Sequence, residues 1–477
     1  MAQLLTPDIC VIGAGSGGLS VAAAAAAFGV ETILIEKDKM GGDCLNFGCV
    51  PSKALLAVGK NAEVFRSSAE FGIKPAEPNI DFEKVHAHIH DVISTIEPHD
   101  SQERFEGLGV KVIRDFGRFV NEDTVVTEKY EIRARRFVIA TGSAPFVPPI
   151  HGIDDIPFFT NETIFQNKKK IDHLIVIGGG PIGMEMAQAH RRLGSKVTVV
   201  EGLKALGKDD PELTQIVLEK LRGEEIEILE NAKVEKLAKK GRSGIVATVL
   251  RDGVETEIEG SHLLVATGRA VNVAGMGLED ANIEYSTKGI RVWDDLRTTN
   301  QRVYAIGDVA GGLQFTHVAG YHAGLVIRGI LFRQKASPQI HMIPWVTFTD
   351  PEIAHIGQTE EEARGKDGGT ETQVLKWDYK ENDRALAERK TTGFIKIIAS
   401  KRGRILGVSI VGANAGEMIN MWSLAIANKM KLRDVIGYIS PYPTMSEIGK
   451  RAVVSSYSPL AKKPLVRWVV RFLQKFG

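Results

Sequence analysis

The chain begins with a short apolar run that is followed at once by a cluster of glycines. Residues 8–12 predict a buried strand, the glycine-rich sequence at 13–18 predicts a tight turn, and the alanine-rich stretch to about residue 28 predicts a helix. A second apolar run at 31–35 predicts another strand, which leads into Glu36. This order is typical of a dinucleotide-binding unit, because the glycines permit a close approach of phosphate and the acid binds ribose hydroxyls.

The same pattern returns later in the chain. Residues 174–177 predict a strand, 178–183 (GGGPIG) the turn, 184–193 the helix and 196–200 the next strand, and Glu201 follows. The first glycine and the acid are 23 positions apart in both copies (36 − 13 and 201 − 178). Two copies in matching context predict two dinucleotide sites. The alternative is a duplicated fold in which one site has been lost.

Each half is also expected to have a closing strand. An apolar run at 137–140 leads into Thr141 and Gly142, and a second run at 263–266 leads into the Thr-Gly-Arg sequence at 267–269. Each run follows one fingerprint and ends in a small, bendable turn, so we interpret the two as equivalent strands of the two halves.

The pattern changes from about residue 340, where no third dinucleotide motif occurs. Strands at 394–398 and 405–411 precede a helix at 417–428, which predicts a separate α+β domain that mediates dimerisation. The fold predicted is α/β, with two Rossmann-like dinucleotide-binding domains and a C-terminal α+β dimerisation domain. The expected domains are 1–150 with 270–339 (discontinuous, first dinucleotide), 151–269 (second dinucleotide), 340–460 (dimerisation) and 461–477 (basic amphipathic tail).

Composition narrows the choice of function. A chain of 477 residues with 43% apolar and 25% charged residues is ordinary for a globular protein of about two to four domains. The formal net charge of +1 gives no reason to expect a nucleic-acid partner. The sequence has no run of 18 apolar residues and no secretory signal, so we expect a cytoplasmic protein without a membrane span.

The last 17 residues contain five basic and no acidic residues, interspersed with apolar ones. The sequence leaves two partners open for this tail: its own dimer, or an anionic membrane surface. The apolar positions are Val466, Trp468, Val469, Val470, Phe472 and Leu473.

The three cysteines are Cys10, Cys44 and Cys49. Cys10 lies in the first predicted strand, where we expect plain packing. Cα atoms five residues apart on a regular helix are roughly 8.6 Å apart, beyond the limit of about 7 Å for a disulfide. A bond between Cys44 and Cys49 therefore requires a distorted helix, for which Gly48 supplies freedom. Strained disulfides are the labile, catalytic kind.

The alternatives are two inert thiols or half of a metal site, and the sequence offers no partners for a metal. The histidine-rich segment at 86–90 does not supply a metal site either, because only His86 and His90 of its three histidines share a helix face. No metal site is predicted.

The segment 41–53 (GGDCLNFGCVPSK) resembles the active-site motif of the class I pyridine nucleotide–disulfide oxidoreductases, which include dihydrolipoamide dehydrogenase, glutathione reductase and mercuric reductase. The resemblance extends from Pro7 to Val453. It implies an FAD-dependent homodimeric enzyme that passes hydride from a nicotinamide cofactor to FAD, and electrons on to a Cys44–Cys49 disulfide and then to an acceptor.

The resemblance also implies a role for each matching residue. Cys49 would face the flavin and Cys44 would exchange with the substrate, while Lys53 and Glu185 match an ion pair beside flavin N5. Residues 304–308 match the second FAD motif of the family. The FAD site would comprise Gly13, Gly15, Gly18, Glu36, Lys53, Gly117, Thr141, Gly142, Asp308 and Thr316, and the nicotinamide nucleotide site Gly178, Gly180, Gly183, Glu201 and Gly268.

The acid at the end of the second fingerprint favours NADH over NADPH. A carboxylate at Glu201 accepts hydrogen bonds from the ribose 2′-hydroxyl and repels a 2′-phosphate. Members that prefer NADPH usually carry arginines just beyond this position, where the chain has Gly202, Leu203 and Lys204.

The chain departs from the disulfide-reducing members near its C-terminus. Their His-Pro-Thr…Glu motif reads Tyr442-Pro443-Thr444…Glu447 here. Tyrosine, with an ordinary pKa of about 10, is a poor base at neutral pH but can donate a hydrogen bond. Mercuric reductases resemble the chain at this tyrosine, yet they carry a C-terminal cysteine pair, and no cysteine follows Cys49.

The electron acceptor therefore stays open among a small-molecule or protein disulfide, a metal ion and a quinone. Two other functions also stay open: a flavoprotein redox sensor, and an NADH oxidase or diaphorase that uses the flavin alone.

Overall fold

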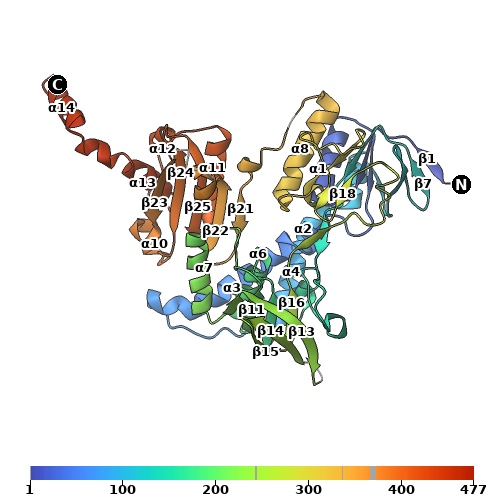
Figure 1. The fold of residues 1–477 in the computed structure, drawn as a ribbon, viewed down its shortest axis with the longest axis horizontal. Coiled ribbons are helices and arrows are strands. Elements are labelled where there is room, and N and C mark those ends of the chain that lie inside the picture. Colours follow the sequence, from blue (N-terminus) through green and yellow to red (C-terminus); the bar gives the residue numbers. More distant parts are fainter. Residues whose placement is uncertain (1, 242–243, 336, 366–371, 477) are drawn as a thin grey trace. The chain divides into compact units, whose positions relative to one another are not determined.

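The computed structural model describes residues 2–241, 244–335, 337–365 and 372–476. These residues form two compact units, each built from two separate stretches of chain (Figure 1). The first unit comprises Met1–Lys204 and Glu225–Pro338, and the second comprises Ala205–Glu224 and Gln339–Gly477. The α/β class predicted from the sequence is confirmed.

A five-stranded parallel sheet of order β20-β8-β2-β3-β4 contains the first glycine fingerprint. β2 and β3 are buried along their whole length, as expected of parallel strands covered on both faces. Helices α1 and α8 pack together over one face, where Val11 and Leu34 join the core. The bounds are β2 Ile9–Ile12, α1 Ser16–Ala27, β3 Thr32–Ile35, β4 Lys111–Ile113, β8 Arg136–Ile139, β20 Val303–Ala305 and α8 Thr316–Phe332.

A second parallel sheet, of order β12-β11-β10-β16, contains the second fingerprint. An antiparallel three-stranded sheet lies beside it, and the two share a core that includes Ile175 and Val249. The bounds are β10 His173–Ile177, α6 Pro181–Arg192, β11 Lys196–Glu201, β12 Glu227–Glu230, β13 Ala232–Lys240, β14 Gly244–Arg251, β15 Val254–Gly260 and β16 His262–Val265.

The two closing strands, β8 and β16, lead into segments that pair with each other. β9 (Ser143–Pro145) follows β8 and is antiparallel to β17 (Arg269–Val271), which follows β16. The turns that the sequence predicts after the two closing strands therefore meet in the structure. The remaining strands of the first unit are β1 Gln3–Leu5, β5 Arg118–Asn121, β6 Thr124–Val126, β7 Tyr130–Ile132, β18 Tyr285–Ser286 and β19 Gly289–Ile290.

The second unit is an antiparallel sheet of order β21-β22-β25-β24-β23 with helices packed against it. Trp422 of α11 is 1% exposed and anchors this core. The bounds are β21 Trp345–Thr347, β22 Glu352–Gly357, α9 Glu360–Arg364, β23 Thr372–Asp378, α10 Asp383–Ala387, β24 Phe394–Ser400, β25 Ile405–Gly412, α11 Ala415–Ala427, α12 Leu432–Gly437, α13 Glu447–Ser455 and α14 Pro464–Leu473.

Helix α7 (Pro211–Gly223) belongs to this second unit, although it lies in the middle of the chain. The sequence analysis placed it with the second dinucleotide fold. In the structure it packs on β22 and β25. The buried ammonium of Lys396 lies 2.6 Å from Asp210 Oδ2 and 2.5 Å from Glu212 Oε2. These ion pairs tie the start of α7 to the C-terminal sheet.

The predicted strands and helices agree with the observed ones to within a few residues at their ends. Among the described helices, none is long and apolar enough to cross a membrane.

Candidate active site

The glycines of the first fingerprint have two different roles. Gly13 has a φ of +106°, and a Cβ on it would lie 2.5 Å from the carbonyl oxygen of Ala140. A Cβ on Gly18 would lie 1.8 Å from Gly13 O, so a side chain is excluded at both positions. At Gly15 the nearest atom to such a Cβ is Gly42 Cα at 4.0 Å, so the backbone there is accessible to a phosphate group.

The second fingerprint repeats this arrangement closely. Gly178 has a φ of +108°, and a Cβ on it would lie 2.4 Å from Ala266 O. A Cβ on Gly183 would lie 2.0 Å from Gly178 O, whereas one on Gly180 would meet no described atom within 4 Å. Each fingerprint thus has a fixed turn and an accessible middle glycine, as a nucleotide site requires.

The acid that ends each fingerprint is held by backbone amides. Glu36 Oε2 accepts a hydrogen bond from Ala14 N at 2.6 Å, and Glu201 Oε2 accepts one from Gly179 N at 2.6 Å. The equivalent contacts show that both carboxylates take the same position relative to their glycine turns. The second oxygen of each accepts from an amide two residues later, Asp38 N at 2.7 Å and Leu203 N at 2.8 Å.

The helix that carries the two active-site cysteines is broken, as the sequence predicts. Cys44 lies in α2 (Gly42–Asn46) and Cys49 is the first residue of α3 (Cys49–Ser67). A Cβ on Gly48 would lie 2.8 Å from Asp43 Oδ2 and 3.1 Å from Asp43 O, so a side chain here would crowd Asp43 where the chain turns back.

The two cysteines are free thiols in this structure, and their side chains share a hydrogen bond. This bond lowers the pKa of Cys49 to about 6, against the effect of burial and with help from Thr316 and Lys53. The same bond, followed by burial, raises the pKa of Cys44. The N-terminus of α3 also favours a thiolate at Cys49. The surroundings of the pair therefore favour the negative charge on Cys49 and the proton on Cys44.

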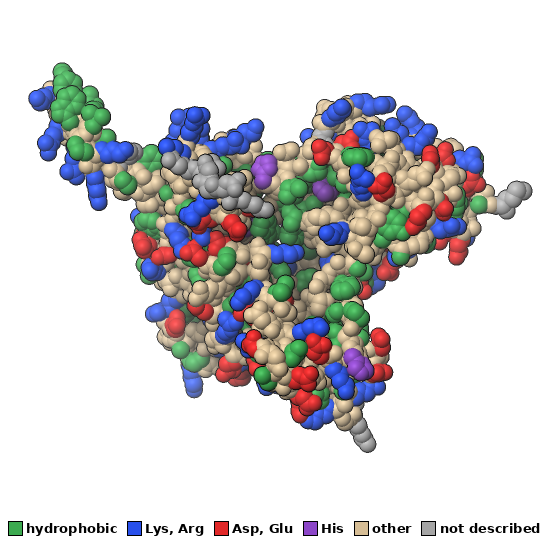
Figure 2. Space-filling model, viewed as in Figure 1, with side chains coloured by type: hydrophobic (Ala, Val, Ile, Leu, Met, Phe, Trp, Pro, Cys, Tyr) green, Lys and Arg blue, Asp and Glu red, His purple; other side chains and the backbone are tan. Residues whose placement is uncertain are grey.

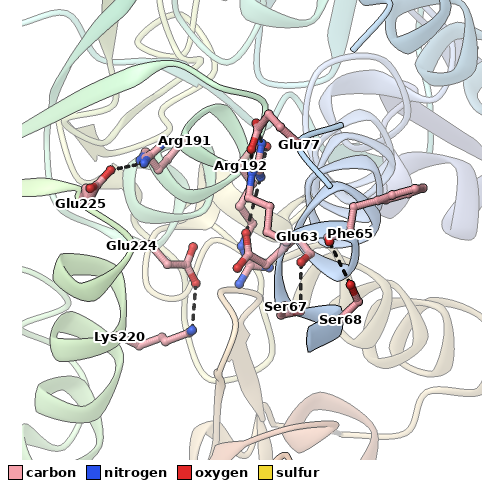
Figure 3. Close-up of polar contacts among 11 residues, drawn as sticks. Glu63, Phe65, Ser67, Ser68, Glu77, Arg191, Arg192, Lys220, Glu224 and Glu225 are labelled. Atoms are coloured by element: carbon pink, nitrogen blue, oxygen red, sulfur yellow. Dashed lines mark hydrogen bonds and ion pairs between the residues drawn. The ribbon is translucent and has the colours of Figure 1, made fainter. Parts of the chain in front are cut away.

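Helix α3 connects the cysteines to the second fingerprint. Lys53 Nζ lies 2.9 Å from Glu185 Oε2 of α6, and Glu185 is only 4% exposed. The other end of α3 is fixed to α6 as well, because the Arg66 guanidinium donates to Arg192 O at 2.8 Å and pairs with Glu77. Figure 3 labels Glu77 and Arg192, the two partners of this guanidinium. The Lys53–Glu185 ion pair that the resemblance implies is thus formed.

The structure also identifies a residue that the sequence analysis did not select. Arg269 Nε donates to Ser143 Oγ at 2.7 Å, and Ser143 Oγ donates to Asp308 Oδ2 at 2.5 Å. The Arg269 guanidinium also lies 3.2 Å from Asp43 Oδ1, next to Cys44. Burial raises the pKa of Asp308. The sequence does contain a signal for Arg269, because Arg269 and Ser143 occupy equivalent positions after the two closing strands.

Other residues predicted for the FAD site have different surroundings. Thr316 Oγ1 lies 3.4 Å from Cys49 Sγ, so it contacts the thiol pair directly. Thr141 Oγ1 donates to Asn272 O at 2.8 Å, beside the left-handed Gly142. A Cβ on Gly117 would lie 3.1 Å from Ile35 Cδ1, so this glycine contacts the core of the sheet. Gly268, predicted for the nucleotide site, also has positive φ.

A pocket of about 370 Å³ opens beside Cys44. One part of its lining is apolar, and another carries the hydroxyls of Ser16 and Ser20, the carboxyl of Asp100 and the guanidinium of Arg104. Burial raises the pKa of Asp100. Apolar members of the lining are Leu19, Ala23, Ile96 and Phe105.

Tyr442 and Glu447 lie in the second unit. Tyr442 is 68% exposed, and its hydrogen bond to Asp383 raises its pKa above the ordinary value. The phenol therefore stays protonated at neutral pH. Glu447 lies 3.9 Å from Arg451.

Among the described residues, no group of three or more His, Cys, Asp or Glu side chains is placed to hold a metal ion. The rings of His86 and His90 lie 4.1 Å apart on one face of α4 (Phe82–Ile96).

Two dinucleotide folds joined to a thiolate–thiol pair define a nucleotide-dependent thiol–disulfide enzyme. Comparison with known proteins gives the same result. The pyridine nucleotide-disulphide oxidoreductase model matches residues 7–323, and the dimerisation domain of that family matches residues 343–453. The chain belongs to the pyridine nucleotide-disulphide oxidoreductase family, whose enzymes use FAD and NAD(P)H.

Two curated relatives and one solved structure are similar over nearly the whole chain. A mercuric reductase of Bacillus cereus is 34% identical over 458 residues, covering 95% of this chain and 72% of the relative. A dihydrolipoyl dehydrogenase of Geobacillus stearothermophilus is 33% identical, covering 93% and 95%. The HOCl-induced flavoprotein disulfide reductase RclA of Escherichia coli is 27% identical with a TM-score of 0.83, covering 94% and 99%.

Proposed function

We propose that this chain is a homodimeric NADH-dependent reductase that delivers electrons through the Cys44–Cys49 pair to an acceptor bound at Cys44. The observation that carries the proposal is the different protonation that the structure favours for the two sulfurs. The shared hydrogen bond leaves the negative charge on Cys49 and the proton on Cys44, which lines a pocket. A pair with one stored charge and one thiol that lines a pocket is suited to passing two electrons to an outside acceptor.

The residues present fit FAD. Gly15 leaves the backbone accessible, Glu36 is fixed to receive ribose hydroxyls, and Asp308 is a half-buried acid that Ser143 holds in place. When bound, FAD accepts a hydride equivalent from the nicotinamide and supplies an electron pair to the disulfide. The Lys53–Glu185 pair would set the charge beside the flavin.

For a disulfide acceptor the exchange at the cysteines balances as follows. Cys44 loses its proton and attacks one sulfur of the acceptor, which releases one thiol and leaves a mixed disulfide on Cys44. The Cys49 thiolate then attacks the Cys44 sulfur, which releases the second thiol and re-forms the Cys44–Cys49 disulfide. One NADH and one proton are consumed for each acceptor disulfide reduced to two thiols.

The pocket beside Cys44 supports a small acceptor with both apolar and polar parts. The acidic side chain of Asp100 and the cationic side chain of Arg104 line it together with apolar side chains. Metal ions are candidate acceptors as well, because similar proteins include mercuric reductases and a copper(II) complex of RclA has been solved.

Thiol counting and an acceptor screen test the proposal. Air-oxidised, flavin-loaded protein denatured in a thiol reagent is expected to show one thiol, Cys10, and protein reduced anaerobically with NADH is expected to show three. A panel of small disulfides, protein disulfides, Hg(II), Cu(II) and quinones should then include an acceptor turned over above about 1 s⁻¹. A constant thiol count refutes the disulfide route, and reduction without turnover by any acceptor favours a redox sensor.

Exchange of Glu201 is expected to change the choice of nicotinamide. Glu201→Arg should raise the ratio of kcat/KM for NADPH over NADH at least tenfold, because it removes a charge that repels the 2′-phosphate and adds one that attracts it. Steady-state kinetics with both nucleotides measures this ratio.

Glu201→Gln is the matched control, since it keeps an oxygen to accept from Gly179 N but carries no charge. We expect it to weaken NADH use with a smaller change in the ratio. An unchanged ratio in Glu201→Arg would contradict the proposed preference for NADH.

Introduction of a base at position 442 is expected to raise activity with small disulfides. Tyr442→His should increase reduction of an oxidised dithiol substrate at least tenfold at pH 7–8, since positioned acid–base groups typically contribute about 10²–10⁴. Tyr442→Phe, which removes the hydroxyl without adding a base, should give no increase. Equal rates in the two variants would show that the pocket, and not the missing base, excludes such substrates.

A further inference from the structure

The C-terminal helix α14 exposes an apolar stripe. Apolar residues recur along it and just beyond it at helical spacing, and those that form the stripe have between 39% and 74% of their surface exposed. The aromatic rings lie along one line, with Trp468 and Phe472 centroids 5.7 Å apart and Phe472 and Phe476 centroids 5.1 Å apart. The stripe comprises Leu465, Trp468, Val469 and Phe472 of α14 and Phe476, which follows the helix.

The opposite face of α14 is cationic. Arg467 and Arg471 of the helix and Lys463 and Lys475, which flank it, follow one another at intervals of four, and the last acidic residue of the chain is Glu447. The whole chain has a formal charge of +1, and the tail contributes +5 with Lys462 included, so the rest of the chain carries −4 (1 − 5). The positive charge is therefore concentrated on this helix.

Within the second unit, α14 projects away from the sheet (Figure 1). No described residue of the helix is buried. Figure 2 shows its hydrophobic side chains gathered at the tip of the projection, with Lys and Arg side chains around them. An isolated helix of about ten residues is marginal in water, so a partner that covers the apolar stripe would stabilise it.

The charge and length of α14 together indicate which partner covers its apolar stripe. Two copies of α14 packed through their apolar stripes would cover the stripes, but the eight cations on their outer faces would have no negative partner. An anionic bilayer instead offers apolar chains below the stripe and negative headgroups beside the cations. Trp468 is typical of residues at that boundary. Ten residues rise only about 15 Å, half of the hydrocarbon thickness, so the helix would lie in the surface.

We propose that α14 attaches the enzyme reversibly to an anionic membrane surface. The apolar stripe enters the boundary between acyl chains and headgroups, and the basic face contacts lipid phosphates. This inference does not depend on the identity of the acceptor.

Vesicle co-sedimentation of the full-length, flavin-loaded protein tests the proposal. Partitioning onto vesicles with 30% phosphatidylglycerol should exceed that onto pure phosphatidylcholine at least tenfold, and 0.5 M NaCl should reduce it, since salt screens exposed charges. Arg467→Glu with Arg471→Glu, and separately Trp468→Ser with Phe472→Ser, should each lower binding at least tenfold.

The matched control is Arg402→Glu with Arg433→Glu, which makes the same charge change at two exposed arginines outside the tail. It should bind like the wild-type protein, and every variant should keep its NADH–ferricyanide activity, which reports an intact fold.

Absence of wild-type binding to anionic vesicles, or equal binding by the control and the tail variants, would overturn the proposal. So would a higher oligomer in sedimentation velocity that Trp468→Ser with Phe472→Ser abolishes, because that result assigns the stripe to a second copy of the chain.

Discussion

Replacement of Cys44 by serine is expected to lower turnover with the physiological acceptor at least 10³-fold, while reduction of the flavin by NADH continues. Cys44 lines the acceptor-side pocket, and a serine hydroxyl forms neither a disulfide with Cys49 nor a bond to an acceptor sulfur or a soft metal. Stopped-flow absorbance measures flavin reduction, and steady-state assays measure acceptor reduction. If turnover persists in this variant, the enzyme uses the flavin alone and the thiol route is wrong.

The same variant also allows the negative charge on Cys49 to be measured. A serine at position 44 can still donate a hydrogen bond to the Cys49 sulfur, so the thiolate should persist well below the ordinary thiol pKa. A pKa of about 6 for Cys49 places the thiolate above pH 6 and the thiol below it. Long-wavelength absorbance from the thiolate beside oxidised flavin should therefore be present at pH 8 and lost as the pH falls through about 6. Cys10→Ser, in the buried strand β2, is the control and should change neither property.

The sequence predicted best those parts of the fold that depend on interactions between residues close together in the chain. The two fingerprints combine glycines that exclude a side chain with an acid that caps the same turn, so both are recognisable in a short window. The second helix was expected from residue 184 and begins at Pro181, because proline is well suited to the first turn, where its missing N–H has no partner to lose. The break at Gly48 was predictable because a regular helix keeps the two cysteines too far apart.

The parts that escaped prediction depend on contacts between distant segments. The sequence around α7 carries no sign that Asp210 will pair with Lys396, which is 186 residues away. Arg269 likewise meets Asp43 and Ser143 only after three separate segments have folded together. Such pairings follow from tertiary packing, which overrides what chain order suggests.

Removal of the Lys53 charge is expected to slow flavin reduction by NADH roughly 10²-fold, the usual cost of losing one preorganised electrostatic group. Lys53→Met takes away the ammonium 2.9 Å from Glu185 Oε2, and that ammonium also lowers the pKa of Cys49. The pKa of Cys49 should consequently rise, so the long-wavelength absorbance should disappear at a higher pH than in the wild-type protein. Stopped-flow kinetics and a pH titration of the absorbance give the two readouts.

The double variant Lys53→Met with Glu185→Gln separates charge from structural damage. The single variant leaves the buried Glu185 carboxylate without its ammonium neighbour, which costs about 3–5 kcal/mol in a fully buried pair and less here because the Lys53 side chain is 37% exposed, and its Tm should fall. The neutral amide in the double variant should restore most of that Tm. Because the positive charge is still missing, the slow flavin reduction and the raised pKa of Cys49 should remain. Recovery of the rate together with the Tm would show that Lys53 acts through packing alone.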